Sequence, residues 1–296
     1  MRYLAIILSI AIVFSQETEV LLSKGNSQLS LGHIEDAEII FNSILKNDPT
    51  FAPALQALSK LNLHKGDLKK ANEYSNQAVQ ADEDFRDWSV KIFAIREHIL
   101  NGNRNIQQGL FEEAIKEYNK ISQTHPYFPD AEFYKGLTRF RQKDIEAAGR
   151  HFSNALKIYP KHEKARKGLD NIRSQFVNLG NKSYKSGNLE QAINYYEKSI
   201  ELDSNWHVPY YQMGILYRKL DQLEKSIEYL NRVLEIKPDH DKTWFTLGSY
   251  YESIDSLHNA ITHYNKALEL NPNYYKASSN LDDLDLNPLF VQADPG

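Results

Sequence analysis

The stretch WFTLGSYYESIDSLHNAITHYNKALELNP, residues 244–272, decides the fold. Its apolar residues recur at the spacing of two amphipathic helices, and Pro272 ends the second of them. Small side chains let the two helix backbones approach closely, while bulky side chains fill the space between them. The small residues are Gly248, Ala260 and Ala267, and the bulky residues include Trp244 and Tyr264. The stretch therefore predicts a packed pair of helices.

The same pattern recurs along the chain with a period of 34 residues. One period upstream, the matching positions are Tyr210, Met213, Gly214, Tyr217, Ser226, Leu230, Val233 and Pro238. The pattern resembles the tetratricopeptide repeat (TPR) family, and seven units can be traced between residues 18 and 274. The resemblance implies an all-α fold, a right-handed superhelical solenoid of about seven helix-turn-helix repeats. A lone repeat cannot bury its own apolar face, so stacking must supply the stability.

The spacing of the repeats is not uniform. The turn positions, residues 32, 66, 109, 143, 187, 221 and 255, are 34 residues apart except at two steps of 43 and 44. The insertions, residues 86–94 and 163–172, lack proline and keep an apolar helical rhythm, which predicts N-terminal extensions of the following first helices. Nine or ten residues are not a whole number of helical turns of about 3.6 residues, so the insertions could offset the stacking and divide the array into three blocks. The alternative is that they only lengthen two helices in one continuous solenoid.

The expected domain organisation follows from these positions. It comprises a signal peptide at residues 1–15, TPR repeats 1–2 at 18–85, repeats 3–4 at 86–162, repeats 5–7 at 163–274, a capping helix at 275–283 and an irregular tail at 284–296.

The N-terminus has the pattern of a secretory signal. Arg2 precedes an apolar run over residues 4–14, and Ser15 follows it as a small residue suited to cleavage. This run is shorter than the roughly 20 apolar residues that a spanning helix needs, and no later segment is long and apolar enough to span a membrane. We expect the signal to be removed and the protein to be periplasmic or secreted. An N-terminal membrane anchor is the alternative.

Composition and motifs exclude several classes of function. The chain has 35 Lys and Arg against 39 Asp and Glu, so it has no overall positive field to attract nucleic acid. It has no cysteine, which excludes disulfides, thiolate nucleophiles and cysteine metal sites. No phosphate-binding glycine loop, nucleophile elbow or zinc-protease motif is present. We therefore expect no cofactor, no metal site, no nucleic-acid partner and no enzymatic activity.

The TPR resemblance also implies which residues would contact a partner, because the first helix of each repeat lines the concave face. In repeats 4–7 the fifth and twelfth places, and the places beside them, hold aromatic and cationic residues. The predicted peptide-binding groove consists of Phe133, Phe140, Arg141, Tyr184, Lys185, Tyr211, Arg218, Lys219, Lys242 and Phe245. Aromatic platforms flanked by cations suit peptides with acidic or apolar side chains.

The sequence thus predicts a non-enzymatic protein–protein interaction scaffold of the cell envelope or secreted space, which binds a peptide segment or partner protein in this groove. The alternative is a glycan-binding accessory module for cell-wall or surface polysaccharide, with Tyr184, Tyr211 and Phe245 stacked on sugar rings. Salt dependence separates the two, because peptide binding led by cations weakens as ionic strength rises. An enzyme with an unrecognised carboxylate pair is the third hypothesis.

Overall fold

The protein is built of helices. A computed structural model describes residues 2–285, and over these residues the chain forms fifteen α-helices, one short 3-10 helix at Glu83–Phe85 and no strand. The all-α fold class predicted from the repeat is confirmed. The chain divides into two compact units, residues 1–169 and residues 170–296. The part of the expected irregular tail at 286–296 lies outside the described residues.

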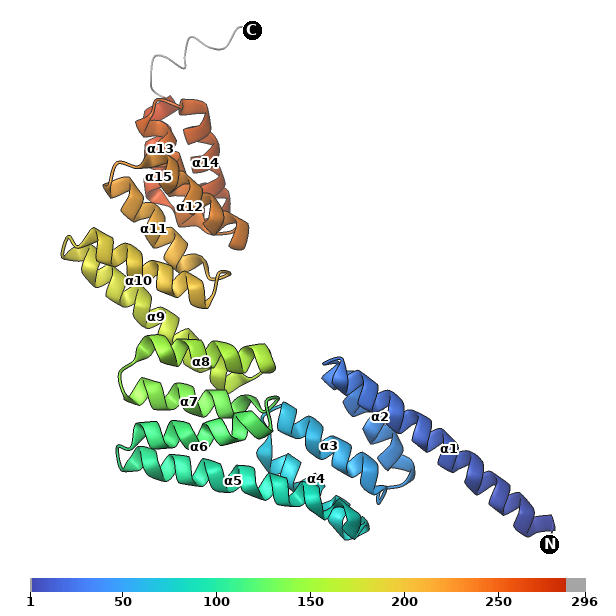
Figure 1. Ribbon diagram of the computed structural model, residues 1–296. Helices are drawn as coiled ribbons and strands as arrows, with labels where there is room; N and C mark the ends of the chain where they lie inside the picture. The colour runs from blue at the N-terminus through green and yellow to red at the C-terminus, as the bar shows by residue number, and fades with distance from the viewer. Residues whose placement is uncertain (1, 286–296) are drawn as a thin grey trace. The chain divides into compact units, whose positions relative to one another are not determined.

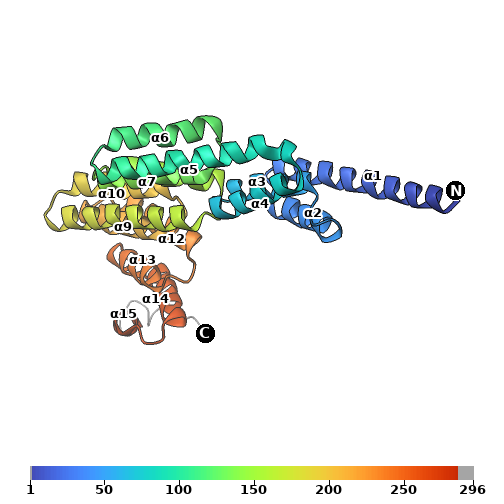
Figure 2. The ribbon, with the colours of Figure 1, turned by 90° about the horizontal axis from the view of Figure 1, so that it is seen from below.

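Unit 1 is a stack of four helix pairs in which odd-numbered helices are the first helices of the repeats. The bounds are α1 Arg2–Ser30, α2 Ile34–Asn47, α3 Ala52–His64, α4 Leu68–Ala81, α5 Arg86–Gln107, α6 Phe111–Thr124, α7 Pro129–Arg141 and α8 Ile145–Ile158. Each first helix packs on its own second helix, and each second helix packs on the next first helix. Helices α5 to α8 lie side by side in this order (Figure 1), and the view from below also shows α5, α6 and α7 adjacent (Figure 2).

Unit 2 begins inside α9 and continues the same alternation. The bounds are α9 Glu163–Lys185, α10 Leu189–Leu202, α11 His207–Lys219, α12 Leu223–Ile236, α13 Asp241–Ser253, α14 Leu257–Leu270 and α15 Tyr275–Asp285. Helix α15 packs against α14, and its residues Ala277 and Leu284 join the buried cluster around Tyr264. It therefore covers the apolar face that the last repeat would otherwise expose.

The two first helices that contain the insertions are uninterrupted and long. Helices α5 and α9 have 22 and 23 residues, whereas α3, α7, α11 and α13 have 13 each. The division between the units falls inside α9, near the second insertion. At the first insertion α4, the short 3-10 helix and α5 pack on one another without a break.

A left-handed residue connects the two helices of every repeat. The seven turn positions all have positive φ: Gly32, Gly66, Gly109 and Gly187, with Lys143, Asp221 and Asp255 in the remaining repeats. The residue after each turn donates its N–H back to the first helix, as Asp67 does to the carbonyl of Asn62 at 2.8 Å. This geometry is a Schellman-type end of the first helix, and it reverses the chain direction within a few residues.

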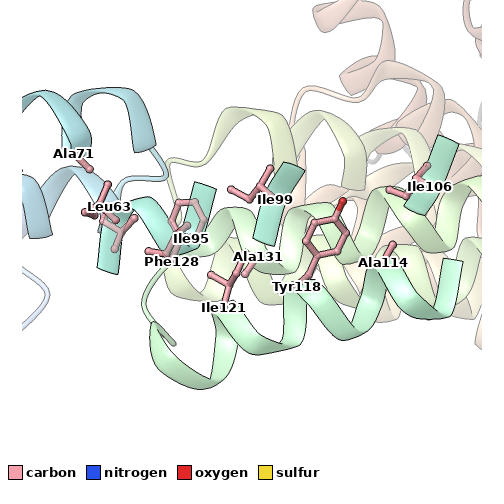
Figure 3. Close-up of a cluster of buried hydrophobic side chains, with 11 residues drawn as sticks. Leu63, Ala71, Ile95, Ile99, Ile106, Ala114, Tyr118, Ile121, Phe128 and Ala131 are labelled. Carbon is pink, nitrogen blue, oxygen red and sulfur yellow. The ribbon is translucent and has the colours of Figure 1, made fainter. Parts of the chain in front are cut away.

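In five of the seven repeats a glycine of the first helix faces an aromatic ring of the second, whereas in the sixth repeat Gly214 faces Leu230. In the cluster of Figure 3, Tyr118 of α6 is fully buried against α5, and a Cβ atom at Gly102 would lie 2.5 Å from its ring. Only glycine permits this approach of the two helices. Glycine faces an aromatic ring in the same way at Gly25 and Phe41, Gly136 and Phe152, Gly180 and Tyr196, and Gly248 and Tyr264.

Unit 1 also has contacts between repeats that are not neighbours. Tyr159, after α8, packs against the cluster around Phe41 of the first repeat, and Lys161 forms an ion pair with Glu35. His64 Nε2 lies 3.4 Å from the carbonyl oxygen of Ile158. A simple solenoid has contacts only between adjacent repeats. In unit 1 the end of the fourth repeat instead contacts the first and second repeats.

Among the helices of the described residues, none combines the length and the hydropathy required to cross a membrane.

Candidate functional site

In unit 2 the first helices of the repeats carry a net positive charge and the second helices carry a net negative charge. Residues 170–185 of α9, together with α11 and α13, carry six Lys and Arg against three Asp and Glu. Helices α10, α12 and α14 carry four Lys and Arg against seven Asp and Glu. The first helices therefore present a positive surface although the protein as a whole is acidic, and such a surface attracts anionic ligands.

Two of these cations lie over aromatic rings of neighbouring first helices. Lys219 Nζ of α11 is 4.7 Å from the ring centroid of Tyr184 in α9. Arg218 Cζ, also of α11, is 4.5 Å from the ring centroid of Tyr250 in α13. Both distances are within the range of cation–π attraction, which restrains the long side chains without neutralising their charge. The three first helices are thus connected by a row of alternating rings and cations.

Four cations of this surface have no carboxylate partner among the described residues. Within the part of the chain that the structure describes, no carboxylate lies within 4.0 Å of the side-chain nitrogens of Lys185, Arg218, Lys219 or Lys242, and all four side chains are exposed. Arg173 differs, since it pairs with Asp170 at 3.0 Å and also with Asp203. The four unpaired cations remain available to an anion from outside the chain.

A second group of rings lies where α11 and α13 begin. The ring centroids of His207 and His240 are 5.1 Å apart, and those of His240 and Tyr211 are 5.3 Å apart. Tyr211 Oη lies 3.4 Å from Thr246 Oγ1. Burial, helped by His207 and Lys237, lowers the pKa of His240 to about 4, so this imidazole is neutral at physiological pH.

The residues predicted for the groove differ in their surroundings. In unit 2, Tyr184, Tyr211 and Phe245 are partly buried, and the ring of Phe245 packs against Tyr274 with centroids 5.0 Å apart. In unit 1, Phe140 is partly buried and Arg141 is exposed.

Phe133 does not lie on a surface. It is only 9% exposed, and its ring contacts Phe152 and His162 in the interior of unit 1, with centroids 5.8 and 5.6 Å away. The prediction that Phe133 lines the peptide-binding groove is therefore corrected. This side chain stabilises the packing between helices, and a peptide would not reach it.

Three aromatic or imidazole residues that support this surface, among them the fully buried Tyr250, were not predicted from the sequence. Tyr250 occupies a place in α13 other than the fifth and twelfth, His240 immediately precedes that helix, and Tyr274 immediately precedes α15. The sequence signal that could have found the last two is the recurrence of an aromatic or imidazole residue just after each proline that ends a second helix.

Comparison with known proteins agrees with the repeat architecture. Four segments match models of the tetratricopeptide repeat, at residues 52–85, 100–163, 175–206 and 206–273. The chain belongs to the tetratricopeptide repeat family. Repeats of this family indicate a protein–protein interaction scaffold.

Individual relatives are distant. The human DnaJ homolog subfamily C member 7 is 28% identical over 199 residues, which cover 62% of this chain and 38% of that protein. The TPR repeat-containing protein MJ1428 of Methanocaldococcus jannaschii is 24% identical, over 69% of this chain and 29% of that protein. The chain thus spans well under half the length of either relative. The crystal structure of the P58(IPK) TPR domain matches 94% of this chain and 100% of that domain, with 14% identity and a TM-score of 0.37.

Proposed function

We propose that this protein is a non-enzymatic scaffold of the cell envelope or secreted space, which holds an acidic peptide segment of a partner protein against the first helices of unit 2. The observation that carries the proposal is the pair of unneutralised cations over aromatic rings, Lys219 over Tyr184 and Arg218 over Tyr250. Family membership supports the scaffold role, and the positive first helices support an acidic ligand.

The physical basis is preorganisation. A Lys or Arg side chain normally loses rotamer freedom when it binds, at a cost of about 0.5–1.5 kcal/mol for each immobilised side chain. Arg218 and Lys219 are already restrained by the rings beneath them, so part of this loss precedes binding. The guanidinium of Arg218 can hold a carboxylate with two parallel hydrogen bonds. The partly buried rings of Tyr184 and Tyr211 offer apolar surface to the residues on either side of that carboxylate, whereas Tyr250 is buried and only restrains Arg218.

A charge-reversal experiment tests the site. The variant Arg218→Glu/Lys219→Glu is compared with Lys225→Glu/Arg232→Glu, in which the same net charge change is made on α12. The control is closely matched, since Lys225 and Arg232 also lie over rings, those of Tyr217 and Tyr210, at 5.2 and 5.8 Å. Circular dichroism verifies that both variants fold.

The readout is fluorescence anisotropy with a library of short labelled peptides that differ in acidic and aromatic content. We expect acidic peptides to lose affinity by about ten-fold or more with the α11 variant and to change little with the α12 control. Raising salt from about 50 to 500 mM should weaken binding to the unmodified protein. Equal losses in the two variants would exclude this surface. Salt-insensitive binding of neutral glycans in place of peptides would favour the carbohydrate-binding alternative.

Export has its own test. Mass spectrometry of the protein recovered from a fractionated host should find a chain that begins at residue 16 and lies outside the cytoplasm. Cleavage there keeps the part of α1 whose residues Leu22 and Leu29 pack on the first repeat's core. Recovery of the chain from the cytoplasmic fraction with residues 1–15 attached would contradict the proposal.

A further inference from the structure

Unit 1 contains a hollow of about 890 Å³. Its wall is made by the end of α1, by α3, by Trp88 near the start of α5, by the turn between α6 and α7, and by the end of α8. The return of the fourth repeat toward the first two brings these segments around one space. The volume lies in the range of about 300–1,000 Å³ that is typical of small-molecule sites.

The lining of the hollow combines apolar surface with positive charge. Leucine, isoleucine and aromatic side chains dominate it, and its basic residues are Lys60, His64, His125 and Lys157. No Asp or Glu is among the lining residues that the structure describes. A smaller hollow of about 330 Å³ adjoins it at Trp88, Thr124 and His125 and adds Lys91 and His98. The charge of the site is therefore complementary to an anion.

Three polar side chains of the wall are already hydrogen-bonded within the protein. Thr124 Oγ1 donates to the carbonyl of Lys120 at 2.9 Å, and Ser30 Oγ donates to the carbonyl of Ser27 at 2.8 Å. Trp88 Nε1 donates to Ser59 Oγ at 2.7 Å. A buried peptide would leave amide groups unpaired here, at a cost of about 1–3 kcal/mol each. A hydrocarbon chain has no such groups, so it suits the interior better than a peptide does.

Lys60, Lys91 and His125 act on one another electrostatically, and no ion pair joins any of them to a described carboxylate, whereas His98 contacts Glu117 at 2.7 Å. Lys60 Nζ lies 5.5 Å from the ring centroid of Trp88, and partial burial together with Lys91 lowers the pKa of Lys60. Burial and Lys91 lower the pKa of His125 as well. An anionic group placed near these side chains would relieve their mutual repulsion.

We propose that this hollow binds an amphiphilic anion, a single apolar chain that ends in a carboxylate or a phosphate. The chain packs against Leu63, Trp88 and Ile158, and the head group pairs with Lys60 and Lys157. The site lies wholly in unit 1, so it stands independently of the peptide surface proposed for unit 2.

Isothermal titration calorimetry of the full chain tests the proposal with four 16-carbon probes, each below its micelle concentration. They are palmitate, hexadecyl phosphate, hexadecanol and hexadecyltrimethylammonium, which separate a carboxylate source from a phosphate source and both from neutral and cationic chains. We expect one or both anions to bind with one-to-one stoichiometry, the alcohol about ten-fold more weakly, and the ammonium not at all.

Substitutions locate the site. Lys60→Gln/Lys157→Gln should weaken anion binding about ten-fold, whereas the control Lys69→Gln/Lys116→Gln, which changes exposed lysines on α4 and α6 outside the hollow, should not. Asn26 is exposed at the hollow, and Asn26→Trp should block the chain without disturbing the core.

Several results would overturn the proposal. Equal binding of all four probes would indicate general adsorption. Unchanged binding after the lysine and Asn26 substitutions would place the probe elsewhere. Binding of an acidic peptide in the hollow, without palmitate binding, would also contradict the proposal. Arg218→Glu/Lys219→Glu should leave palmitate binding intact, so failure of the peptide surface and failure of this site are distinguishable.

Discussion

Replacing His162 with alanine should destabilise unit 1 strongly, because this side chain joins three elements at once. Its Nε2 donates to Asp130 Oδ1 of α7 at 2.7 Å, and its Nδ1 accepts the N–H of Ala165 in the first turn of α9 at 3.0 Å. The ring also lies against the α3–α4 turn, where a Cβ atom at Gly66 would be 3.0 Å from it. The side chains of His162 and Asp130 are 5% and 4% exposed.

The expected loss of unfolding free energy follows from these contacts. Loss of the N-terminal helix cap costs about 1 kcal/mol, and a buried carboxylate left without its partner costs about 1–3 kcal/mol or more. With the lost packing, we expect a decrease in unfolding free energy of about 3–5 kcal/mol, in line with other broken buried pairs. For a unit of this size each kcal/mol shifts the melting temperature by about 2–4 °C, so the transition of unit 1 should fall by roughly 10 °C.

Differential scanning calorimetry of the full chain measures this shift. His151→Ala is the matched control, since His151 Nδ1 contacts Glu132 Oε2 at 2.8 Å in the same unit but its side chain is 25% exposed. The control should cost about 1 kcal/mol or less, because Glu132 keeps Lys135 as a partner. If His162→Ala melts no lower than His151→Ala, the reasoning that this buried pair holds unit 1 together is refuted.

Two further predictions concern the turns and the pH response. Lys143 has φ 65°, so Lys143→Gly should raise the unfolding free energy by about 1 kcal/mol in urea titrations, whereas Gln142→Gly, at a residue with ordinary helical φ, should lower it. The lowered pKa of His240, about 4 against an ordinary 6.5, means that the unfolded state binds the proton more readily between these values, so unit 2 should lose stability as pH falls from about 6.5 to 4. His240→Gln should flatten this loss in urea midpoints measured at several pH values, and an unchanged slope would contradict it.

The local structure of the repeats could be predicted from the sequence because it depends on residues close together in the chain. The turn positions aligned by their spacing are the residues with positive φ, including Lys143, Asp221 and Asp255, where no glycine marks the turn. Periodicity alone located them, since the helices on either side fix the register. The facing of glycine and aromatic side chains, as at Gly248 and Tyr264, follows from the same register.

The candidate sites could be predicted only in part, because they depend on how repeats stack. A helical register places a side chain on a face, but it does not say what covers that face. Phe133 has the expected register and is nevertheless buried, since Phe152 and His162 pack over its ring. The hollow of unit 1 needs the rotation accumulated over four repeats, and no short-range pattern contains that angle.

The two units use their charged residues differently, and this difference explains why each has its own kind of candidate site. In unit 1 the ion pairs Lys65–Glu38 and Lys161–Glu35 connect separate repeats. These contacts, with the return of Tyr159 to the first repeat's core, keep the wall of the hollow in place. An apolar interior then remains with Lys60 and Lys157 at its lining, where the described residues include no Asp or Glu.

In unit 2 Arg173 and Arg232 form ion pairs with Asp203 and Glu235, but the two cations at the end of α11 form none with the described residues. Arg218 and Lys219 are restrained by rings, which keep their positions without cancelling their charge. An exposed ion pair contributes only about 0–1 kcal/mol to stability, so the fold gives up little by leaving these cations unpaired. In the proposed complex, a carboxylate of the partner would be attracted by both cations at once. The unpaired cations are therefore compatible with the acidic ligand that we propose for this surface.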